Sequence, residues 1–409
     1  MKPFRRRSVP VRAHGLSNRG FKRRNLARSI RLALLLGGGA TFSQQAAAVC
    51  ELPGPAVLPL VTITGTCFGT GTLSTNTFNV EPASLFYNLQ SLLVTANLNN
   101  LGTFDNLGTL SGNGAITNNG TFLNSGAMLS GQVFTNNGTA EFRYGSDVFV
   151  RSSNVVNTVL TGGIWDIGIS AGTGGIHLNG GNPIRGIAAD LTLRGRGAYL
   201  PELLLRDNQG SITLLSGALL GTFGTKSDAF NNDGTISIGG DSIFAVSGSM
   251  QGKGTLHNDG WLLLEDVQLA DEGRLNNNGI VESHGGDVAF YASDNLSAQD
   301  KWLTGGTWRI HSRIGQGSFA IGPAISIERL EADVLLSGEG VQFGQLDGLR
   351  ENYGVLTLED GAALTMSNFT TNAGSLVIGA GSTVTLRQQK LGGGATVYPT
   401  PARCSTTAP

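Results

Sequence analysis

Charged residues, cysteine and proline are all scarce in this sequence of 409 residues. Charged side chains make up 14% of it, against roughly 25% in ordinary globular chains. Three cysteines are too few for a disulfide-dense scaffold. Twelve prolines, with no three-residue glycine period, exclude a collagen-like triple helix. Leu, Ile, Val and Phe are spread along the chain, which excludes disorder as its general state.

Glycine is abundant instead, with 61 residues, and much of it occurs in one motif. Asn-x-Gly followed by a small residue recurs along the chain, for example in "TNNGTF" from Thr117 and "TNAGSL" from Thr371. Strand-like alternations such as "STVTL" separate the copies. A catalytic motif is needed once, so a motif used many times is better explained as a structural corner. We assign this role to Asn118, Gly120, Asn136, Gly138, Asn232, Gly234, Asn277, Gly279, Asn372 and Gly374.

Two properties suit Asn-x-Gly to a corner. Glycine accepts positive φ without steric cost, and asparagine is the next most tolerant residue. Stacked asparagine side chains can also hydrogen-bond from one turn to the next and so fix the register.

The motif recurs at a nearly constant spacing. Gly102, Gly120 and Gly138 are evenly spaced, and the later intervals, such as Gly354 to Gly374, are slightly longer. This pattern predicts an all-β, single-stranded β-solenoid over residues 99–386, with turns of about 18–22 residues. A six-residue subdivision of the period is typical of left-handed hexapeptide coils. The Asn-x-Gly corners and the irregular later turns favour a right-handed parallel β-helix.

A longer repeat overlies the turns. "LTGGIWDI" from Leu160 recurs as "LTGGTWRI" from Leu303, and "IAADLTLRGRGA" from Ile187 recurs as "LEADVLLSGEGV" from Leu330 at the same offset. A duplicated unit of about 140 residues favours one continuous solenoid over the two or three globular domains that length alone would suggest.

The order "LTGGTW", "LEADVLLSGEGV", "NYGVLTL" and "NAGSLVIGAGSTVTL" resembles the repeat-bearing passenger regions of bacterial autotransporters and haemagglutinin-like exoproteins. The resemblance covers Asn99 to Leu386. It implies a secreted or surface-displayed β-helix, often with a role in adhesion or biofilm. We recognise neither a translocating barrel nor a two-partner secretion domain, so the resemblance does not specify an export route.

Residues 1–48 are expected to be a signal peptide with a long basic region. Eleven of the 28 Lys and Arg residues lie at or before Arg31, ahead of any acid, and "LALLLGGGATF" from Leu32 has the length of a signal-peptide apolar core. Small residues up to Ala48 suit cleavage there. We therefore expect export through the inner membrane, to the periplasm, cell surface or medium, of a chain without an intrinsic membrane span.

The segments that flank the solenoid differ from it in composition. Residues 49–98 are expected to cap the first turn, because an open strand edge invites aggregation. Within them Cys50 and Cys67 lie close in sequence, and in an oxidising compartment a disulfide is favoured over two free thiols. Residues 387–409 lack the corner motif and are expected to be an irregular, disordered tail, as if a longer passenger had been truncated or its reading frame altered.

No set of residues predicts catalysis, a cofactor or a metal. The carboxylates recur between the two copies, which favours a role in the repeat over a unique acid–base pair; the pairs are Glu141 with Glu282, Asp147 with Asp287, and Asp190 with Asp333. Asp166 is an exception, because its counterpart is Arg309. Four histidines lie far apart without ligand spacing and are interpreted as surface residues; they are His177, His257, His284 and His311. Trp165 and Trp308 are equivalent, and core filling is favoured over carbohydrate stacking.

The leading functional hypothesis is a secreted or surface-exposed bacterial protein, adhesin-like or structural, without catalysis. Its partners would be host or matrix glycans or surface proteins. Nucleic acid is disfavoured, because the chain beyond the leader is acidic. One alternative is a β-helix lyase or hydrolase that acts on extracellular polysaccharide. Another is a truncated passenger without independent function.

Overall fold

The computed structural model describes residues 50–52, 56–128, 133–143, 148–149, 151–168, 174–178, 182–200, 203–222, 229–313, 317–322, 324–387 and 404–406. All of them belong to one compact unit, Ala48–Pro409. The second unit, Met1–Ala47, lies outside the described residues, and so does the expected signal peptide.

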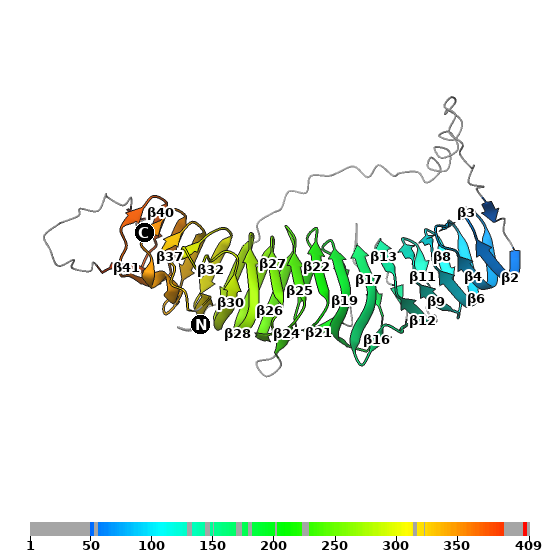
Figure 1. The fold of residues 1–409 in the computed structure, drawn as a ribbon, viewed down its shortest axis with the longest axis horizontal. Helices are drawn as coiled ribbons and strands as arrows, with labels where there is room; N and C mark the ends of the chain where they lie inside the picture. The colour runs from blue at the N-terminus through cyan, green and yellow to red at the C-terminus, as the bar shows by residue number, and fades with distance from the viewer. Residues whose placement is uncertain are drawn as a thin grey trace, which may run out of the picture. The chain divides into compact units, whose positions relative to one another are not determined.

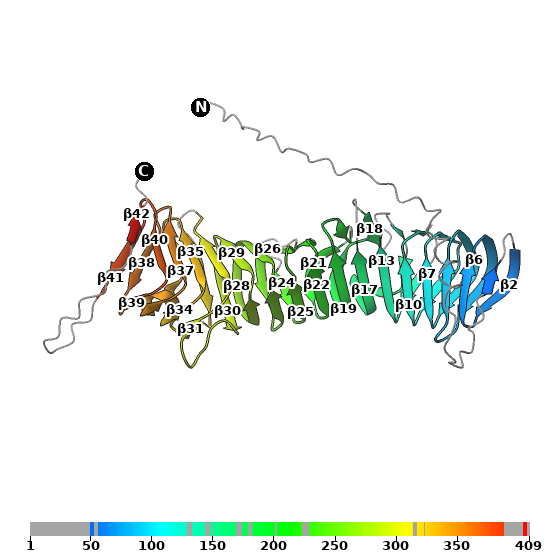
Figure 2. The same cartoon turned by 90° about the horizontal axis from the view of Figure 1, so that it is seen from above.

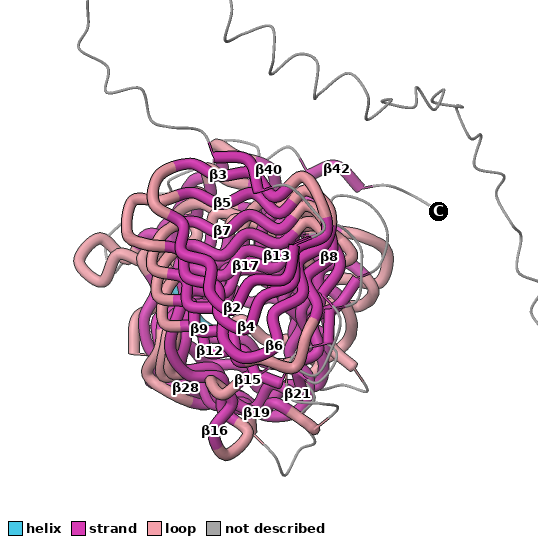
Figure 3. Tube along the Cα trace, turned by 90° about the vertical axis from the view of Figure 1, so that its right-hand side faces the viewer, coloured by secondary structure: helices cyan, strands magenta, loops and turns pink. Residues whose placement is uncertain are grey.

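The described unit is a parallel β-solenoid of about 14 turns (Figure 1). This confirms the predicted fold class. Figure 2 shows the same stack of turns from above, and Figure 3 looks along the stack from the end that carries the first strands. Among the described residues, no helix has the length and apolar character needed to cross a bilayer. The direction of coiling stays a prediction.

The first third of the solenoid contains β1 (Cys50–Leu52), β2 (Ala56–Ile63), β3 (Thr66–Gly69), β4 (Thr72–Val80), β5 (Leu85–Asn88), β6 (Ser91–Asn100), β7 (Thr103–Asn106), β8 (Thr109–Ser111), β9 (Ala115–Asn118), β10 (Thr121–Asn124), β11 (Ala127–Met128), β12 (Val133–Asn136) and β13 (Thr139–Arg143). The strands β8, β9 and β10 form three sides of one turn, and β11, β12 and β13 stack on them in parallel.

The middle third contains β14 (Val148–Phe149), β15 (Arg151–Ser152), β16 (Val155–Val156), β17 (Val159–Gly168), β18 (Gly174–His177), β19 (Ile184–Arg194), β20 (Ala198–Tyr199), β21 (Leu203–Asn208), β22 (Ser211–Leu215), β23 (Leu219–Gly221), β24 (Phe230–Asn232), β25 (Thr235–Ile238), β26 (Ile243–Gln251), β27 (Thr255–Asn258), β28 (Trp261–Asn277), β29 (Ile280–His284) and β30 (Asp287–Ser293). The β16–β17 pair is an antiparallel hairpin that projects from this parallel stack.

The last third contains β31 (Trp302–Leu303), β32 (Thr307–His311), β33 (Ser318–Ile321), β34 (Arg329–Leu330), β35 (Asp333–Ser337), the 3-10 helix η1 (Gly344–Gly348), β36 (Glu351–Asn352), β37 (Val355–Glu359), β38 (Ala363–Met366), β39 (Thr371–Asn372), β40 (Ser375–Ile378), β41 (Thr383–Leu386) and β42 (Cys404–Thr406). The helix η1 replaces a strand on one side of its turn, which the strand pattern of the sequence does not indicate.

The interior is a continuous apolar column. Because side chains alternate across a strand, every second residue points inward, and equal register puts the inward residues of successive turns in one line. Phe86, Phe104 and Phe122 occupy the same position in three consecutive turns and are buried. The rings of Phe104 and Phe122 stack with centroids 5.3 Å apart. Burial of such rings stabilises the turns that carry them.

The boundaries of the solenoid differ from those expected. The strands between Cys50 and Asn99 already pair in parallel with their neighbours, so the regular stack begins well before residue 99. The described part of the segment 49–98 therefore forms turns of its own. At the other end, β42 pairs with β40, within the tail that was expected to be irregular. The rest of 388–409 lies outside the described residues.

Asparagine ladders brace the corners from inside. The side chains of Asn100, Asn118 and Asn136 are buried and linked in series, with Nδ2-to-Oδ1 distances of 2.7 and 2.8 Å. A parallel ladder links Asn88, Asn106 and Asn124. Shorter ladders follow at Asn208–Asn232, Asn258–Asn277 and Asn352–Asn372, although the length of the turn differs among them. The ladder predicted from the motif is confirmed.

Glycine is needed at these corners for a different reason from the one expected. Gly120 does not have a positive φ. Instead, a Cβ atom placed on Gly120 would lie 2.1 Å from the carbonyl oxygen of Gly102 in the turn below. The backbones of successive corners approach too closely for any side chain, so the expectation based on left-handed φ is wrong here.

The duplicated "LTGG" motif has the same conformation in both copies. Gly162–Gly163 has φ values of 65° and 69°, and Gly305–Gly306 has 66° and 67°. In each copy the indole Nε1 of the following tryptophan donates to the carbonyl of the first glycine, at 2.9 Å for Trp165 and 3.1 Å for Trp308. Both indoles are fully buried. They fill the core, as expected, and are not presented to sugars.

Candidate functional site

The two early cysteines are joined. Cys50 on β1 and Cys67 on β3 form a disulfide between neighbouring turns, with their Cα atoms 4.5 Å apart. They are register partners, so the bond links two strands that already lie side by side. This disulfide is an element of the scaffold at the start of the stack.

The repeated carboxylates do not gather into one site. Glu141 pairs with Arg143 on its own strand, and Asp166 pairs with Arg194 on a neighbouring strand. Asp287 accepts a hydrogen bond of 2.7 Å from the Ser318 hydroxyl. Asp190 and Asp333 are exposed at equivalent strand positions in the two copies. Asp147 lies outside the described residues.

Two of the four histidines, unlike the repeated carboxylates, lie next to each other in the fold. The strands β29 and β32 are parallel neighbours, and their register places His284 opposite His311. The two imidazole rings stack with centroids 4.5 Å apart and an interplanar angle of 5°. His177 and His257 lie on other strands, β18 and β27. His284 and His311 are separated along the chain by one long turn of the solenoid.

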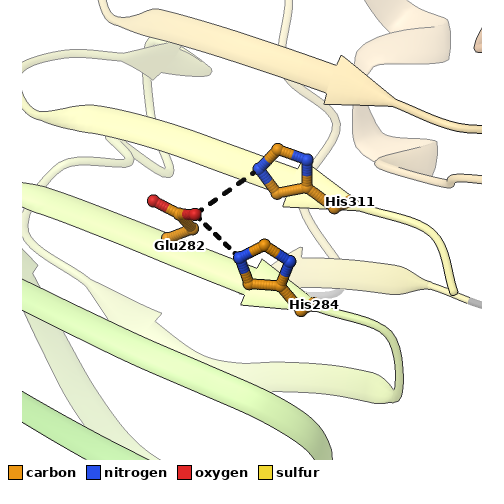
Figure 4. A group of neighbouring side chains, drawn as sticks. All are labelled: Glu282, His284 and His311. Carbon is orange, nitrogen blue, oxygen red and sulfur yellow. Dashed lines mark hydrogen bonds and ion pairs between the residues drawn. The ribbon is translucent and has the colours of Figure 1, made fainter. Parts of the chain in front are cut away.

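A carboxylate completes this group (Figure 4). Glu282 lies two residues before His284, so both side chains point outward from β29 while Val281 and Ser283 point inward. Glu282 Oε1 is 2.7 Å from His284 Nε2 and 3.8 Å from His311 Nε2. Its other oxygen, Oε2, accepts a hydrogen bond of 3.3 Å from Arg309 Nη1. We call Glu282, His284 and His311 the two-turn cluster.

The cluster is shielded although it lies on the outer face. Only 12% of the Glu282 side chain is exposed, and 23% of His311. Burial lowers the pKa of His311 below its ordinary value; the neighbouring His284 lowers it further, and Glu282 acts in the opposite direction. Neutral imidazole can donate through one nitrogen and accept or bind a metal through the other. The arrangement can therefore act as an ion-pair network or as a set of metal ligands.

The first copy of the duplicated unit has other residues at these positions. There Glu141 is opposite Asp166, and Arg143 is opposite Gly168. The glutamate is thus shared between the copies, but both histidines of the cluster are specific to the second copy. An alignment of the two copies reveals this difference, because Arg143 in the first copy corresponds to His284 in the second, and Gly168 corresponds to His311. Spacing along the chain does not reveal it, because the two histidines are neighbours across the turn.

A second group of outward side chains lies on the side formed by β31, β34 and β36. The Arg329 guanidinium lies between two aromatic rings, 4.3 Å from the centroid of Trp302 and 4.2 Å from that of Tyr353. Trp302 is 37% exposed and Tyr353 is 44% exposed. We call these three residues the aromatic stack. No signal in the sequence pointed to it, because its members come from three successive turns.

Comparisons with known proteins add no family to these observations: no protein-family model, curated protein or solved structure that was compared with the chain matches it.

Proposed function

We propose that the chain is an exported, non-catalytic protein of the adhesin or matrix type, whose outer faces bind extended polysaccharide. The leader-like start of the sequence and its resemblance to passenger regions support export. The solenoid supports the rest, because a stack of similar turns offers a long surface on which the same groups recur at one-strand intervals.

The observation that carries the proposal is the aromatic stack. Tryptophan, tyrosine and arginine each combine a flat, stackable face with a hydrogen-bond donor. Here all three lie together on the outside of neighbouring turns, with both rings partly exposed. Glu331 and Glu351 pair with Arg329 and place further hydrogen-bonding groups beside it. Sugar rings present apolar faces for the aromatics and hydroxyl groups for the charged side chains.

Cosedimentation with insoluble polysaccharides tests this proposal, with new reducing ends measured in the same samples. We expect the purified full chain to bind at least one polymer without releasing reducing ends. Trp302→Ala and Tyr353→Ala should each weaken binding several-fold. Tyr291→Ala is the matched control, because Tyr291 is an aromatic side chain with 67% exposure on β30 and lies outside the stack.

Two outcomes would contradict the proposal. Equal binding by Trp302→Ala, Tyr353→Ala and Tyr291→Ala would remove the aromatic stack as the binding surface. Release of reducing ends that a single substitution such as Glu282→Gln abolishes would favour the alternative, a lyase or hydrolase on the same fold.

A further inference from the structure

We propose that the two-turn cluster of Glu282, His284 and His311 is a binding site for a divalent transition-metal ion of the zinc class, held between neighbouring turns of the solenoid. The site is independent of the aromatic stack and of the proposed binding of polysaccharide. A bound ion would link β29 to β32 through side chains, in addition to the backbone hydrogen bonds between the two strands.

The donor set selects the class of ion. Two imidazole nitrogens and one carboxylate oxygen are the three ligands of an open zinc site, with a fourth position left for water. Imidazole suits zinc, copper and nickel, whereas magnesium and calcium prefer sites made of oxygen ligands. The cluster should therefore bind Zn²⁺ in preference to Mg²⁺ or Ca²⁺.

The distances are close to those that an ion requires. One donor atom from each of the three residues lies within 4.8 Å of the other two. Metal–ligand bonds of about 2.0–2.2 Å in a tetrahedron place donor atoms roughly 3.4 Å apart. The present distances from Glu282 Oε1, 2.7 Å to His284 and 3.8 Å to His311, lie on either side of that value. The two imidazole planes are nearly parallel, so both histidine side chains must rotate to direct their Nε2 lone pairs at one ion.

Two further contacts suit a metal site better than a simple ion pair. Arg309 occupies Oε2 of Glu282, which leaves Oε1 directed at the imidazoles; such an outer partner is usual for a ligating carboxylate. His311 Nε2 is shielded from solvent, and no group among the described residues makes a hydrogen bond with it. A buried polar atom without a partner is costly, and a bound ion would satisfy it.

Metal titration of the purified full chain, without a histidine tag, tests the site. Binding of ZnCl2 is measured by calorimetry, and Co²⁺ serves as a spectroscopic probe of the coordination. We expect one equivalent of Zn²⁺ per chain, and a visible Co²⁺ spectrum of a four-coordinate site. His284→Ala and His311→Ala should each weaken binding more than tenfold and abolish that spectrum. His257→Ala is the matched control, because His257 is a single exposed histidine on the outer side of β27.

The first copy allows a gain-of-function variant. Glu141 is present there, and the change of Arg143→His together with Gly168→His supplies both imidazoles at register partners. A Cβ at Gly168 would meet Arg194 at 3.7 Å, an ordinary contact, so the backbone at this position has room for the Cβ of a histidine. This variant should bind a second equivalent of Zn²⁺.

Circular dichroism establishes that each variant is folded before its binding is compared. The proposal is overturned if the wild-type chain binds no Zn²⁺, or if folded His284→Ala and His311→Ala bind it as well as His257→Ala does. A folded first-copy variant that binds no second ion would contradict the claim that this register assembles the site.

Discussion

The Nδ2 of Asn118 donates a hydrogen bond to Oδ1 of Asn136 at 2.8 Å, one turn further along the solenoid. The same Nδ2 donates to the carbonyl of Thr139 at 2.9 Å. Oδ1 of Asn118 accepts in turn from Asn100. A primary amide carries a donor and an acceptor on one rigid group, so each asparagine can bind the turn on either side. The ladder is therefore repeated wherever the motif is repeated.

Replacement of Asn118 by alanine should destabilise the solenoid. It removes the hydrogen-bond donor to the buried Asn136 Oδ1, which costs about 1–3 kcal/mol for a buried group left unsatisfied, whereas Asn100 Nδ2 keeps its bond to the Thr121 carbonyl. The midpoint of urea unfolding measures the loss. Asn119→Ala is the control, since Asn119 is exposed at the same corner, where water can replace its bond from Asn137, and it should change stability by less than about 0.5 kcal/mol. Equal effects of the two substitutions would show that the ladder contributes nothing specific.

Gly120→Ala should be destabilising although the glycine does not have a positive φ. The new methyl group would lie 2.1 Å from a backbone oxygen, which cannot move as a flexible side chain can, so two turns must separate. The cost should reach about 1–3 kcal/mol, as for an overpacked core. Gly240→Ala is the matched control, because no atom lies within 4 Å of its Cβ position. Thermal unfolding compares the two, and a tolerated Gly120→Ala would contradict close approach as the reason for glycine.

The architecture was predictable because it depends on local chemistry that is repeated. Period, corner motif and strand alternation are each visible in the sequence, and they agree with one another. The reason for glycine was not visible, since close approach involves residues one full turn apart, such as Gly102 and Gly120. The start of the stack was also missed. The turns from Cys50 to Asn99 lack regular Asn-x-Gly corners, yet the same apolar alternation lets them stack.

The two-turn cluster was beyond the reach of a spacing rule. Ligand spacings of two to five residues describe sites within one loop or one helical face. In a solenoid the nearest neighbour of a side chain is one turn away, and the length of that turn varies. His284 and His311 become neighbours only when the strand register of β29 and β32 is known.

Asp105→Asn should stabilise the protein at neutral pH. Burial raises the pKa of Asp105 above its ordinary value of 3.8, while Arg143 lowers it and Glu141 raises it to smaller extents. A folded-state pKa above the unfolded value means that the ionised carboxylate costs stability at pH 7. The cost disappears as the pH falls below the ordinary pKa, because both states are then protonated. Melting temperatures should differ by a few degrees at most at pH 7, and converge below about pH 4.

Asp333→Asn is the control for that experiment, since Asp333 is exposed at the start of β35 and should not change the melting temperature in this way. A lower melting temperature for Asp105→Asn at pH 7 would contradict the prediction. It would show that favourable contacts of the carboxylate outweigh the cost of its burial.

The disulfide provides a test of export. A bond between Cys50 and Cys67 persists only in an oxidising compartment, so its redox state in cells reports where the chain folded. In bacteria that express the full chain with its own leader, we expect the chain in the periplasm or medium, with these two cysteines oxidised in the mass spectrum of an unreduced digest. Closure of the loop by the bond should contribute roughly 3 kcal/mol, so reductant should lower the melting temperature of the exported chain.

Two leader variants separate export from other reasons for oxidation. Leu34→Arg with Leu36→Arg interrupts the apolar run of the leader and should keep the chain in the cytoplasm with both thiols reduced. Reductant should then leave its melting temperature unchanged, because there is no bond to break. Arg23 and Arg24 form a pair such as the twin-arginine export pathway requires, but the flanking Lys22 and Asn25 fit that motif poorly, so Arg23→Lys with Arg24→Lys should leave export unchanged. Wild-type chain recovered from the cytoplasm with free thiols would contradict both the leader and the exported function.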